Sequence, residues 1–422
     1  MSTAWRWLSR GLIVLLIGVL LLAVVWTYGR LTSPTESQRE AVAVMQAQLP
    51  MPAGDNGFDL LMALPPAPES PWPKSLQCSE ASSCLDAAQS ASAEDVATLA
   101  LWRPRLEVAE RALHAPAFRD TREIALMGMN DLPAFVDVTN LDSLRALQFA
   151  AGQTEQALDN VCADAVGASR WAVDPDSLLH AMIGIAVFRQ QAALIADMRS
   201  RAPTDTLPAS CSALARAPDP AIESSFCNAM RGEWRHHQRT FSGLMLEMER
   251  QGSTFERLKT NLMHDSDWMV ATAAKSFSAA CTDEARLAAR QDHVYGFVAP
   301  KIRWVDRVAY AASSILSDFS LTGYTVYFER QLDHVARRRL LAALLQMDAM
   351  DLTLTSQQRF DSLPAELRDG PRPLVLAVDG SALTVLTRGL RNESQEPDGA
   401  RLALAQAVTT EMPLAAESAL TP

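Results

Sequence analysis

Two polar residues in the middle of a long predicted helix are the best candidates for chemistry in this chain. Glu233 and His237 are four residues apart, so a helix places them on one face, in an apolar stripe that continues from Met230 to Phe241. A carboxylate that orients an imidazole prepares it to act as a general acid or to bind a metal. One hypothesis is therefore a hydrolase of the cell envelope that uses Glu233 and His237 as catalytic residues.

Other residues could extend this pair, and a structural explanation competes with it. The residues that could join it are His236, His264, Asp265 and Asp267. The competing explanation is a hydrogen-bonded polar pair that fixes how the helix packs, or a stripe that twists toward water. We favour this explanation, because two histidines do not define a metal site. Leu178 to Phe188 is apolar nearly all round and too short to span a bilayer, so it predicts the central buried helix of a bundle. His180, which interrupts this segment, is interpreted in the same way as the polar pair.

The sequence lacks the motifs of the common enzyme classes. It has no G-x-S-x-G elbow, no phosphate-binding glycine loop, no H-E-x-x-H helix and no dinucleotide glycine fingerprint. We therefore expect no cofactor and no metal, and we favour a protein without catalytic activity.

Two further groups of side chains could form binding surfaces. Arg337 to Arg339 form a basic run, which is typical of a solvated face or of carboxylate partners, with a site for an acidic partner as the alternative. Several methionines could line an adaptable groove, although their helical spacing is more typical of a core. They are Met230, Met245, Met248, Met263 and Met269.

An apolar segment near the start of the chain, Gly11 to Tyr28, decides where these residues lie. Its eighteen residues carry no charge, and as a helix they extend roughly 27 Å, close to the hydrocarbon thickness of a bilayer. The apolar core runs into W-T-Y-G-R-L (residues 26–31), which offers no small-residue cleavage site. The segment predicts a retained transmembrane signal anchor over residues 11–28, with a cleaved signal peptide or a buried core helix as alternatives.

Residues on either side of this segment predict its orientation. Arg6 and Arg10 precede it, and aromatic rings stand at both ends, where the two headgroup layers would lie. The positive-inside rule places residues 1–10 in the cytoplasm and exports the rest. We expect a single-pass protein of a bacterial inner membrane whose bulk lies in the periplasm.

The cysteines fit an exported chain. An even number of them in an oxidising compartment indicates disulfides, and ordinary buried thiols are the alternative. They are Cys78, Cys84, Cys162, Cys211, Cys227 and Cys281. Proximity in sequence favours Cys78 with Cys84 and Cys211 with Cys227, which leaves Cys162 for Cys281. Cys/His spacing typical of a zinc site does not occur.

Composition limits the partners that the chain can have. With 48% apolar residues it can bury a substantial core, and its net charge of -11 argues against nucleic acid as a partner. The bilayer, reached through residues 11–28, and a periplasmic protein are the partners that we expect.

The region 29–91 is predicted to be a short helix followed by a tether. Ser33, Pro34 and Glu36 form a helix start, and a run of prolines after residue 64 favours extended chain. From residue 92 to 350, apolar residues recur every three or four positions and predict an antiparallel array or bundle of helices. The starts include Ser92 with Asp95, Asp174 with Pro175 and Asp219 with Pro220.

One hairpin of this array has a familiar pattern. Leu144 to Asn160 resembles half of a tetratricopeptide repeat, with Gly152 at the turn and Ala157 at the packing position. A period of about 34 residues, which a repeat array requires, does not recur. We interpret the segment as a helical hairpin.

Strand character is confined to the end of the chain. Residues 373–379 and 382–387, joined by Asp379 and Gly380, predict a small β-hairpin within the segment 351–390. Residues 391–422 lack periodicity and aromatic side chains, so we expect a flexible tail. The sequence predicts a mainly α protein with one transmembrane helix. We expect this protein to serve as a protein-binding, scaffold or envelope-assembly factor.

Overall fold

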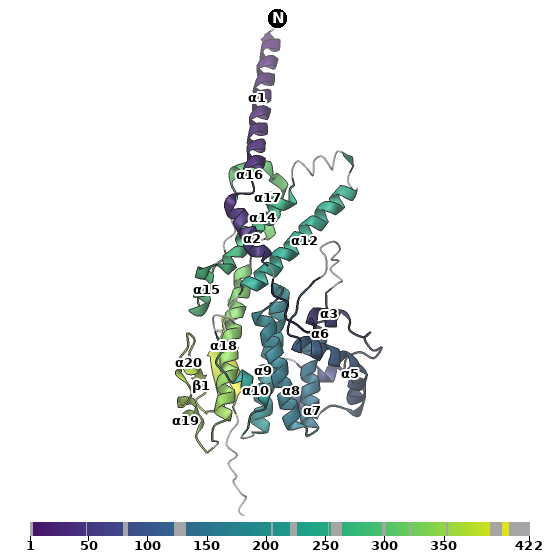
Figure 1. Ribbon diagram of the computed structural model, residues 1–422, viewed down its shortest axis with the longest axis vertical. Coiled ribbons are helices and arrows are strands. Elements are labelled where there is room, and N and C mark those ends of the chain that lie inside the picture. Colours follow the sequence, from purple (N-terminus) through teal and green to yellow (C-terminus); the bar gives the residue numbers. More distant parts are fainter. Residues whose placement is uncertain are drawn as a thin grey trace, which may run out of the picture.

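A computed structural model shows a mainly helical molecule with one long helix projecting from the body (Figure 1). The structure describes residues 3–47, 49–78, 83–121, 132–203, 206–219, 226–251, 253–254, 264–297, 301–320, 323–351, 353–388 and 399–404. Helices in the first half are α1 (Thr3–Thr32), α2 (Glu36–Gln46), α3 (Gly57–Met62), η1 (Lys74–Leu76), α4 (Cys84–Gln89), α5 (Ala93–His114), α6 (Val136–Thr139), α7 (Leu141–Ala150), α8 (Thr154–Val173) and α9 (Leu178–Arg201). Those in the second half are α10 (Ala209–Leu214), α12 (Cys227–Gln251), α14 (Ser266–Phe277), η3 (Ser278–Cys281), α15 (Asp283–Arg290), α16 (Trp304–Ala309), α17 (Ala311–Ser320), α18 (Tyr324–Asp348), α19 (Ser356–Asp361) and α20 (Ala365–Arg368).

Helix α1 is a candidate membrane span. Within the described residues, two helices are long and apolar enough to cross a bilayer, Ser9–Thr32 and Leu178–Arg201. The first is 0% buried over its most apolar window, whereas the second is 61% buried. The second, α9, is therefore the buried central helix that the sequence predicts, whereas the most apolar window of α1 is exposed.

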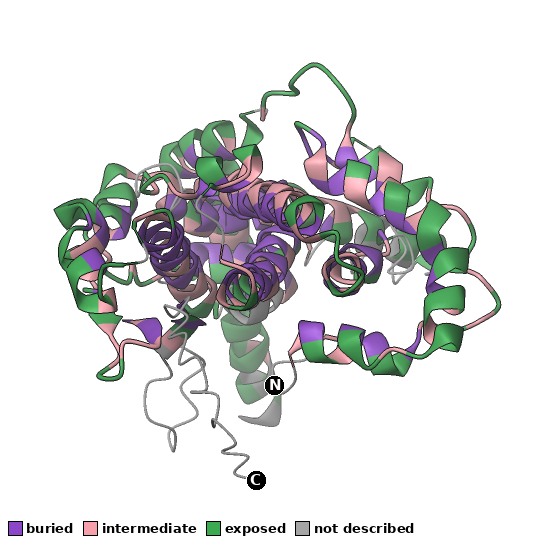
Figure 2. Ribbon diagram, turned by 90° about the horizontal axis from the view of Figure 1, so that it is seen from below, coloured by how far each residue is buried: buried purple, intermediate pink, exposed green. Residues whose placement is uncertain are grey.

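Buried apolar side chains of the described residues form three clusters. Figure 2 shows the buried residues gathered along the helices in the middle of the view. The large core joins α5, α7, α8 and α10 to the second halves of α9 and α18. The middle core joins α2, α12 and α14 to the first halves of α9 and α18. A small cluster around Trp268 and Tyr310 lies at the base of α1. Helices α9 and α18 therefore tie the two larger cores into one body.

A small antiparallel sheet packs on the large core. Its strands are β1 (Val375–Leu376), β2 (Ala382–Leu386) and β3 (Gly399–Ala403), in the order β1-β2-β3. Leu383 pairs with Leu402, and both side chains are buried. The predicted hairpin is confirmed, but β3 lies in the segment expected to be a flexible tail. The alternation of Leu402 and Leu404 with polar or small residues is too short, and too poor in β-branched residues, to indicate a strand.

The proline-rich segment is part of the body and not a tether. It contains α3, η1 and α4, and buries Phe58, Leu61, Leu76 and Leu85. Asn56 caps α3 and also donates to the carbonyl of Arg119, which fixes the segment against the chain that follows α5. The prolines exclude helix only where they stand, and the apolar residues between them contribute to the large core.

Helix starts were predicted correctly where capping is local. Ser92 and Asp95 form the capping box of α5. Helix α2, however, starts at Thr35 instead of Ser33, and α9 is capped by Ser177 instead of Asp174. The two residues that were wrongly predicted as caps bond to distant residues instead. Ser33 donates to Asp306, and Asp174 pairs with Arg119. The predicted start at Asp219 and Pro220 lies mostly outside the described residues.

The hairpin interpretation of residues 144–160 is confirmed. Helices α7 and α8 pack together across a turn in which Gly152 has a φ of 83°, a left-handed conformation that favours glycine.

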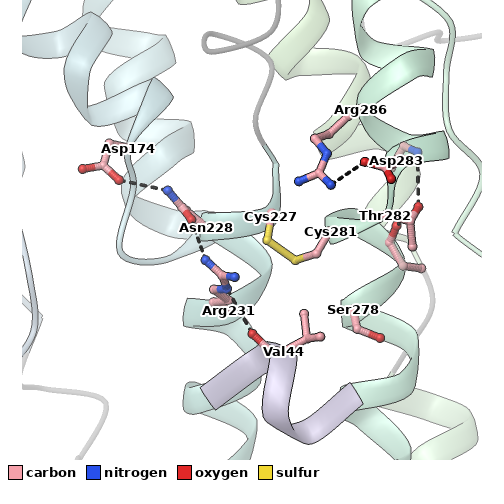
Figure 3. Close-up of a disulfide and its surroundings, with 12 residues drawn as sticks. Val44, Asp174, Cys227, Asn228, Arg231, Ser278, Cys281, Thr282, Asp283 and Arg286 are labelled. Carbon is pink, nitrogen blue, oxygen red and sulfur yellow. Dashed lines mark hydrogen bonds and ion pairs between the residues drawn. A yellow bond between two sulfur atoms is a disulfide. The ribbon is translucent and has the colours of Figure 1, made fainter. Parts of the chain in front are cut away.

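All six cysteines form disulfides, but only the Cys78–Cys84 pairing was predicted correctly. Cys162 on α8 pairs with Cys211 on α10, and the Cα atoms are 5.0 Å apart. Cys227 at the start of α12 pairs with Cys281 at the end of η3, with a Cα separation of 4.7 Å (Figure 3). Proximity in sequence failed because α8 and α10 pack side by side, as do α12 and η3.

Candidate functional site

The first candidate residue, Glu233, caps another helix. Helix α12 crosses the start of α9 at Gly232, so closely that a Cβ there would collide with the carbonyl of Asp176. This crossing brings the Glu233 carboxylate to the backbone N–H of Leu178, which donates to Oε1 at 3.1 Å. The first N–H groups of a helix lack partners within the helix, and Glu233 supplies one. Burial raises the pKa of Glu233, although the hydrogen bond from Leu178 opposes this effect.

The second candidate residue, His237, bonds a tyrosine. Its Nε2 lies 3.3 Å from the hydroxyl of Tyr324, and its ring contacts those of Phe241 and Phe277. Burial, together with the neighbouring His236, lowers the pKa of His237 to about 4. Burial also raises the pKa of Tyr324, so at neutral pH this is a bond between a neutral imidazole and a neutral phenol. No sequence pattern pointed to Tyr324, which belongs to a different helix and forms no motif with His237.

Residues that could have extended the pair lie elsewhere or face water. Asp265 caps α14 and forms an ion pair with Arg30 at 2.9 Å, at the base of α1. The carbonyl of His264 accepts from the same arginine. His236 and Asp267 are exposed. The structure thus places Glu233 and His237 on the inward side of α12 and gives them separate partners, Leu178 and Tyr324.

Substitution of Glu233 is expected to separate its structural role from a catalytic one. Glu233→Gln keeps an oxygen acceptor for the Leu178 N–H, so the free energy of unfolding should change by less than about 0.5 kcal/mol. Glu233→Ala removes the acceptor and should cost about 1–2 kcal/mol. Urea unfolding of the two variants measures the difference. Equal losses of unfolding free energy in the two variants would show that the charge of Glu233, and not its capping oxygen, stabilises the fold.

A second polar group surrounds the loop that leads into α9. Asp174 pairs with Arg119, and Asp176 pairs with Arg235 on α12. His180 is buried, stacks on Phe118 with ring centroids 3.9 Å apart, and accepts from the N–H of Asp176. A cavity beside these residues has a volume of about 10 Å³, which is the space of one water molecule. This group holds the loop in place and has no room for a substrate.

Acid is expected to destabilise the fold through its buried histidines. Burial lowers the pKa of His180 and, with help from Arg338, lowers that of His334 to about 3. The pKa of His237 is lowered as well. A group with a depressed pKa binds fewer protons in the folded than in the unfolded state. Stability is therefore complete above about pH 6.5 and falls as the pH drops below it, by up to about 1.4 kcal/mol per pH unit for each histidine.

Urea unfolding at about pH 7.5 and about pH 5.5 checks this expectation. The control is His334→Gln, which removes one titrating group and leaves the contributions of all carboxylates in place. This variant should lose less stability on acidification than the wild type. An unchanged pH dependence would contradict the assignment of His334 as a buried neutral group.

Glu110, His114 and Asp164 form the one cluster in the described residues with the spacing of a metal site. The Arg145 guanidinium occupies its centre, 2.8 Å from Asp164 and 2.6 Å from Glu110. His114 Nε2 lies 2.8 Å from the other oxygen of Asp164. The hydrogen bonds from His114 and Arg145 hold the pKa of Asp164 below its usual value, although its complete burial acts in the opposite direction. A cation is therefore already built into this cluster, and it is best described as an ion-pair network.

The basic run is not a solvated face. Arg338 and Arg339 are buried, and they donate to backbone carbonyls: Arg338 to those of Ala213 and Leu214, and Arg339 to that of Arg372. Several carbonyls at the end of a helix lack partners, and a guanidinium can satisfy more than one of them. The run therefore serves to join α18 to α10 and to the chain before the sheet.

The methionines with described side chains belong to the interior. Met230 and Met269 are buried in the middle core and in the small cluster at the base of α1. Met245, Met248 and Met263 lie outside the side chains that the structure describes. The two described methionines therefore agree with the favoured interpretation as core residues, and the alternative of an adaptable groove has no support in the described side chains.

Comparison with known proteins finds no matching family model, no similar curated protein and no similar solved structure. The function of this chain has to be argued from its own residues.

Proposed function

We propose that the chain is a single-pass protein of a bacterial inner membrane, with its amino terminus in the cytoplasm and a helical periplasmic body that binds other proteins. The observation that carries this proposal is the junction between α1 and the body. The apolar helix does not end in a loop. Its last turns are packed into the folded structure, which a signal peptide removed by cleavage would not require.

Three kinds of contact make this junction. Gly29 lies so close to α16 that a Cβ would collide with Ala309 and with the carbonyl of Val305. Arg30 pairs with Asp265 and lies over the ring of Tyr310. The guanidinium of Arg303 donates to the carbonyl of Thr32 and, at 2.7 Å, to the hydroxyl of Ser33. Residues from two distant parts of the chain, Asp265 and the stretch from Arg303 to Tyr310, thus hold the end of α1, which supports a retained anchor.

The disulfides support an oxidising compartment. Structural disulfides persist in the periplasm and are rare in the cytoplasm, where thiols are kept reduced. Here they join segments that are 49 and 54 residues apart as well as one short loop. This arrangement, with the arginines that precede the apolar helix, supports export of everything after it.

The described surface supports protein binding better than small-molecule binding. Small ligands bind in concave pockets with mostly apolar walls. A hollow with a volume of about 630 Å³ is an open groove at the turn between α7 and α8. Its walls are polar and include Gln153, Glu155 and Asp159. Such an open polar surface suits a scaffold or an assembly factor, which binds other proteins.

The hydrolase hypothesis has less support. It relies on Glu233 and His237, but Glu233 caps α9 and His237 bonds Tyr324. The pKa of about 4 for His237 is also far from the neutral value that suits a general acid or base. Hydrolase activity of the purified protein, lost in Glu233→Gln and retained in a stability-matched control, would revive it.

Crosslinking in intact cells tests protein binding. The chain is purified after crosslinking, and each partner recovered is then bound to purified full-length protein in detergent. The control is a variant without Cys162 and Cys211, which keeps α1 but weakens the body. We expect a partner that binds the wild type directly and the control weakly. Recovery of no protein that binds directly would overturn the proposal.

A further inference from the structure

Large apolar side chains are exposed where the body meets α1. Trp304 on α16 is 66% exposed, Ile315 on α17 is 57% exposed, and Leu31 in the last turn of α1 is 80% exposed. Helices α16 and α17 lie at the base of α1 (Figure 1). We call α16 and α17 together the collar. A soluble protein rarely gathers such residues on its surface without a partner that covers them.

The contacts of α16 fix its level along α1. The amino-terminal end of α16 lies at the carboxyl-terminal end of α1, because Arg303, the residue before α16, donates to the carbonyl of Thr32. Its last residue, Ala309, shares a cluster with Trp26 and meets the helix at Gly29. Helix α16 therefore runs antiparallel to α1 and lies beside residues 26–32, which occupy about 9 Å of helix axis.

That stretch coincides with the layer where a bilayer would present its headgroups. The apolar segment of α1 ends at Tyr28, and each polar layer of a bilayer is about 5–7 Å thick. Thr32 is four residues, or about 6 Å, beyond Tyr28. Trp304, at the level of Thr32, is consequently placed in this layer, where amphipathic indole rings are favoured.

Charges on the collar suit the same environment. Lys301 and Arg307, on either side of Trp304, are exposed. Asp306, the acidic residue between them, is buried and paired with Arg303 at 2.7 Å. The described surface around Trp304, from Lys301 to Arg307, is thus apolar and basic, although the chain carries a net charge of -11. Basic groups beside a membrane-spanning helix attract anionic headgroups.

We propose that the collar rests on the bilayer that α1 spans, with Trp304, Ile315 and Leu31 in the headgroup layer and Lys301 and Arg307 facing anionic lipid. This inference rests on the proposed membrane anchoring of α1. It adds that the body has no free stalk. The junction and the collar together hold it at one orientation, so that the parts of the body farthest from α1, including the sheet, face away from the membrane.

Fluorescence quenching in vesicles tests this contact. The full-length protein is reconstituted into vesicles of phosphatidylcholine and phosphatidylglycerol, with and without lipids brominated near the headgroup end of the acyl chain. The chain has nine tryptophans, so the contribution of Trp304 is the difference between the wild type and Trp304→Phe. Trp72→Phe is the matched control, because Trp72 packs on Trp102 in the large core.

We expect brominated lipid to quench the Trp304 contribution by more than about half and to leave the Trp72 contribution unchanged. An unquenched Trp304 in protein that resists carbonate extraction would overturn the collar contact while α1 remains an anchor. If a second copy of the chain or another protein covered the collar instead of lipid, Trp304 would also be unquenched in protein that resists carbonate extraction. Protein that carbonate extracts from the vesicles would overturn the anchoring and the collar contact together.

Discussion

Removing the disulfide between Cys162 and Cys211 is expected to lower the free energy of unfolding by about 4 kcal/mol. The bridge closes a segment with a sequence separation of 49 residues, and the loss of this restraint gives the unfolded chain more conformations. Both cysteines are fully buried in the large core, so Cys162→Ala/Cys211→Ala also removes packing between α8 and α10. Urea unfolding without reductant measures the effect.

The short bridge provides the control for this prediction. Cys78 and Cys84 are separated by only 6 residues, so Cys78→Ala/Cys84→Ala should cost about 2 kcal/mol, or roughly half as much. Peptide mapping of the unreduced wild type should recover Cys162 linked to Cys211 and Cys227 linked to Cys281. A peptide that joins Cys211 to Cys227 would contradict the structure.

Arg145→Met is expected to destabilise the fold by about 3–5 kcal/mol. The substitution leaves the Asp164 carboxylate in the interior without the guanidinium that bonds it at 2.8 Å. His114, 2.8 Å from the other oxygen of Asp164, would remain as a partner, but the charge of the guanidinium would be lost from the interior. Loss of one member of a buried ion pair is among the largest penalties that a single substitution can impose.

Two further variants separate an ion-pair network from a metal site. Removal of both partners, in Arg145→Met/Asp164→Leu, should restore much of the lost stability. Glu110→Gln, at a partly exposed side chain, should cost less than about 1 kcal/mol. A metal site would behave differently, because chelator would lower the melting temperature of the wild type and Glu110→Gln would abolish that response.

Features encoded by neighbouring residues could be predicted from the sequence. Ser92 and Asp95 started a helix as expected, because the hydrogen bonds of the capping box join only these two residues. The buried helix α9 and the β-hairpin were also recognised from local patterns. In contrast, Ser33 and Asp174 have the residue types of caps, but Asp306 and Arg119 engage them from distant segments. Local rules cannot anticipate this competition.

The candidate site shows the same limit. Helical spacing correctly predicted that Glu233 and His237 face inward on one helix. Their partners, the N–H of Leu178 and the hydroxyl of Tyr324, come from helices that only the tertiary fold brings near. The functional meaning of the pair depends on those partners, so the sequence alone left a catalytic and a structural explanation open.

The side of the membrane on which the body lies is the central claim, and a reporter fusion tests it most directly. A phosphatase that is active only outside the cytoplasm is fused to the end of the complete chain, since a fusion after residue 350 would remove the strand residues Leu383 and Leu402 from the large core. With the fusion protein in the membrane fraction, we predict high phosphatase activity. An inactive phosphatase on an intact, membrane-bound chain would place the body in the cytoplasm and contradict the account.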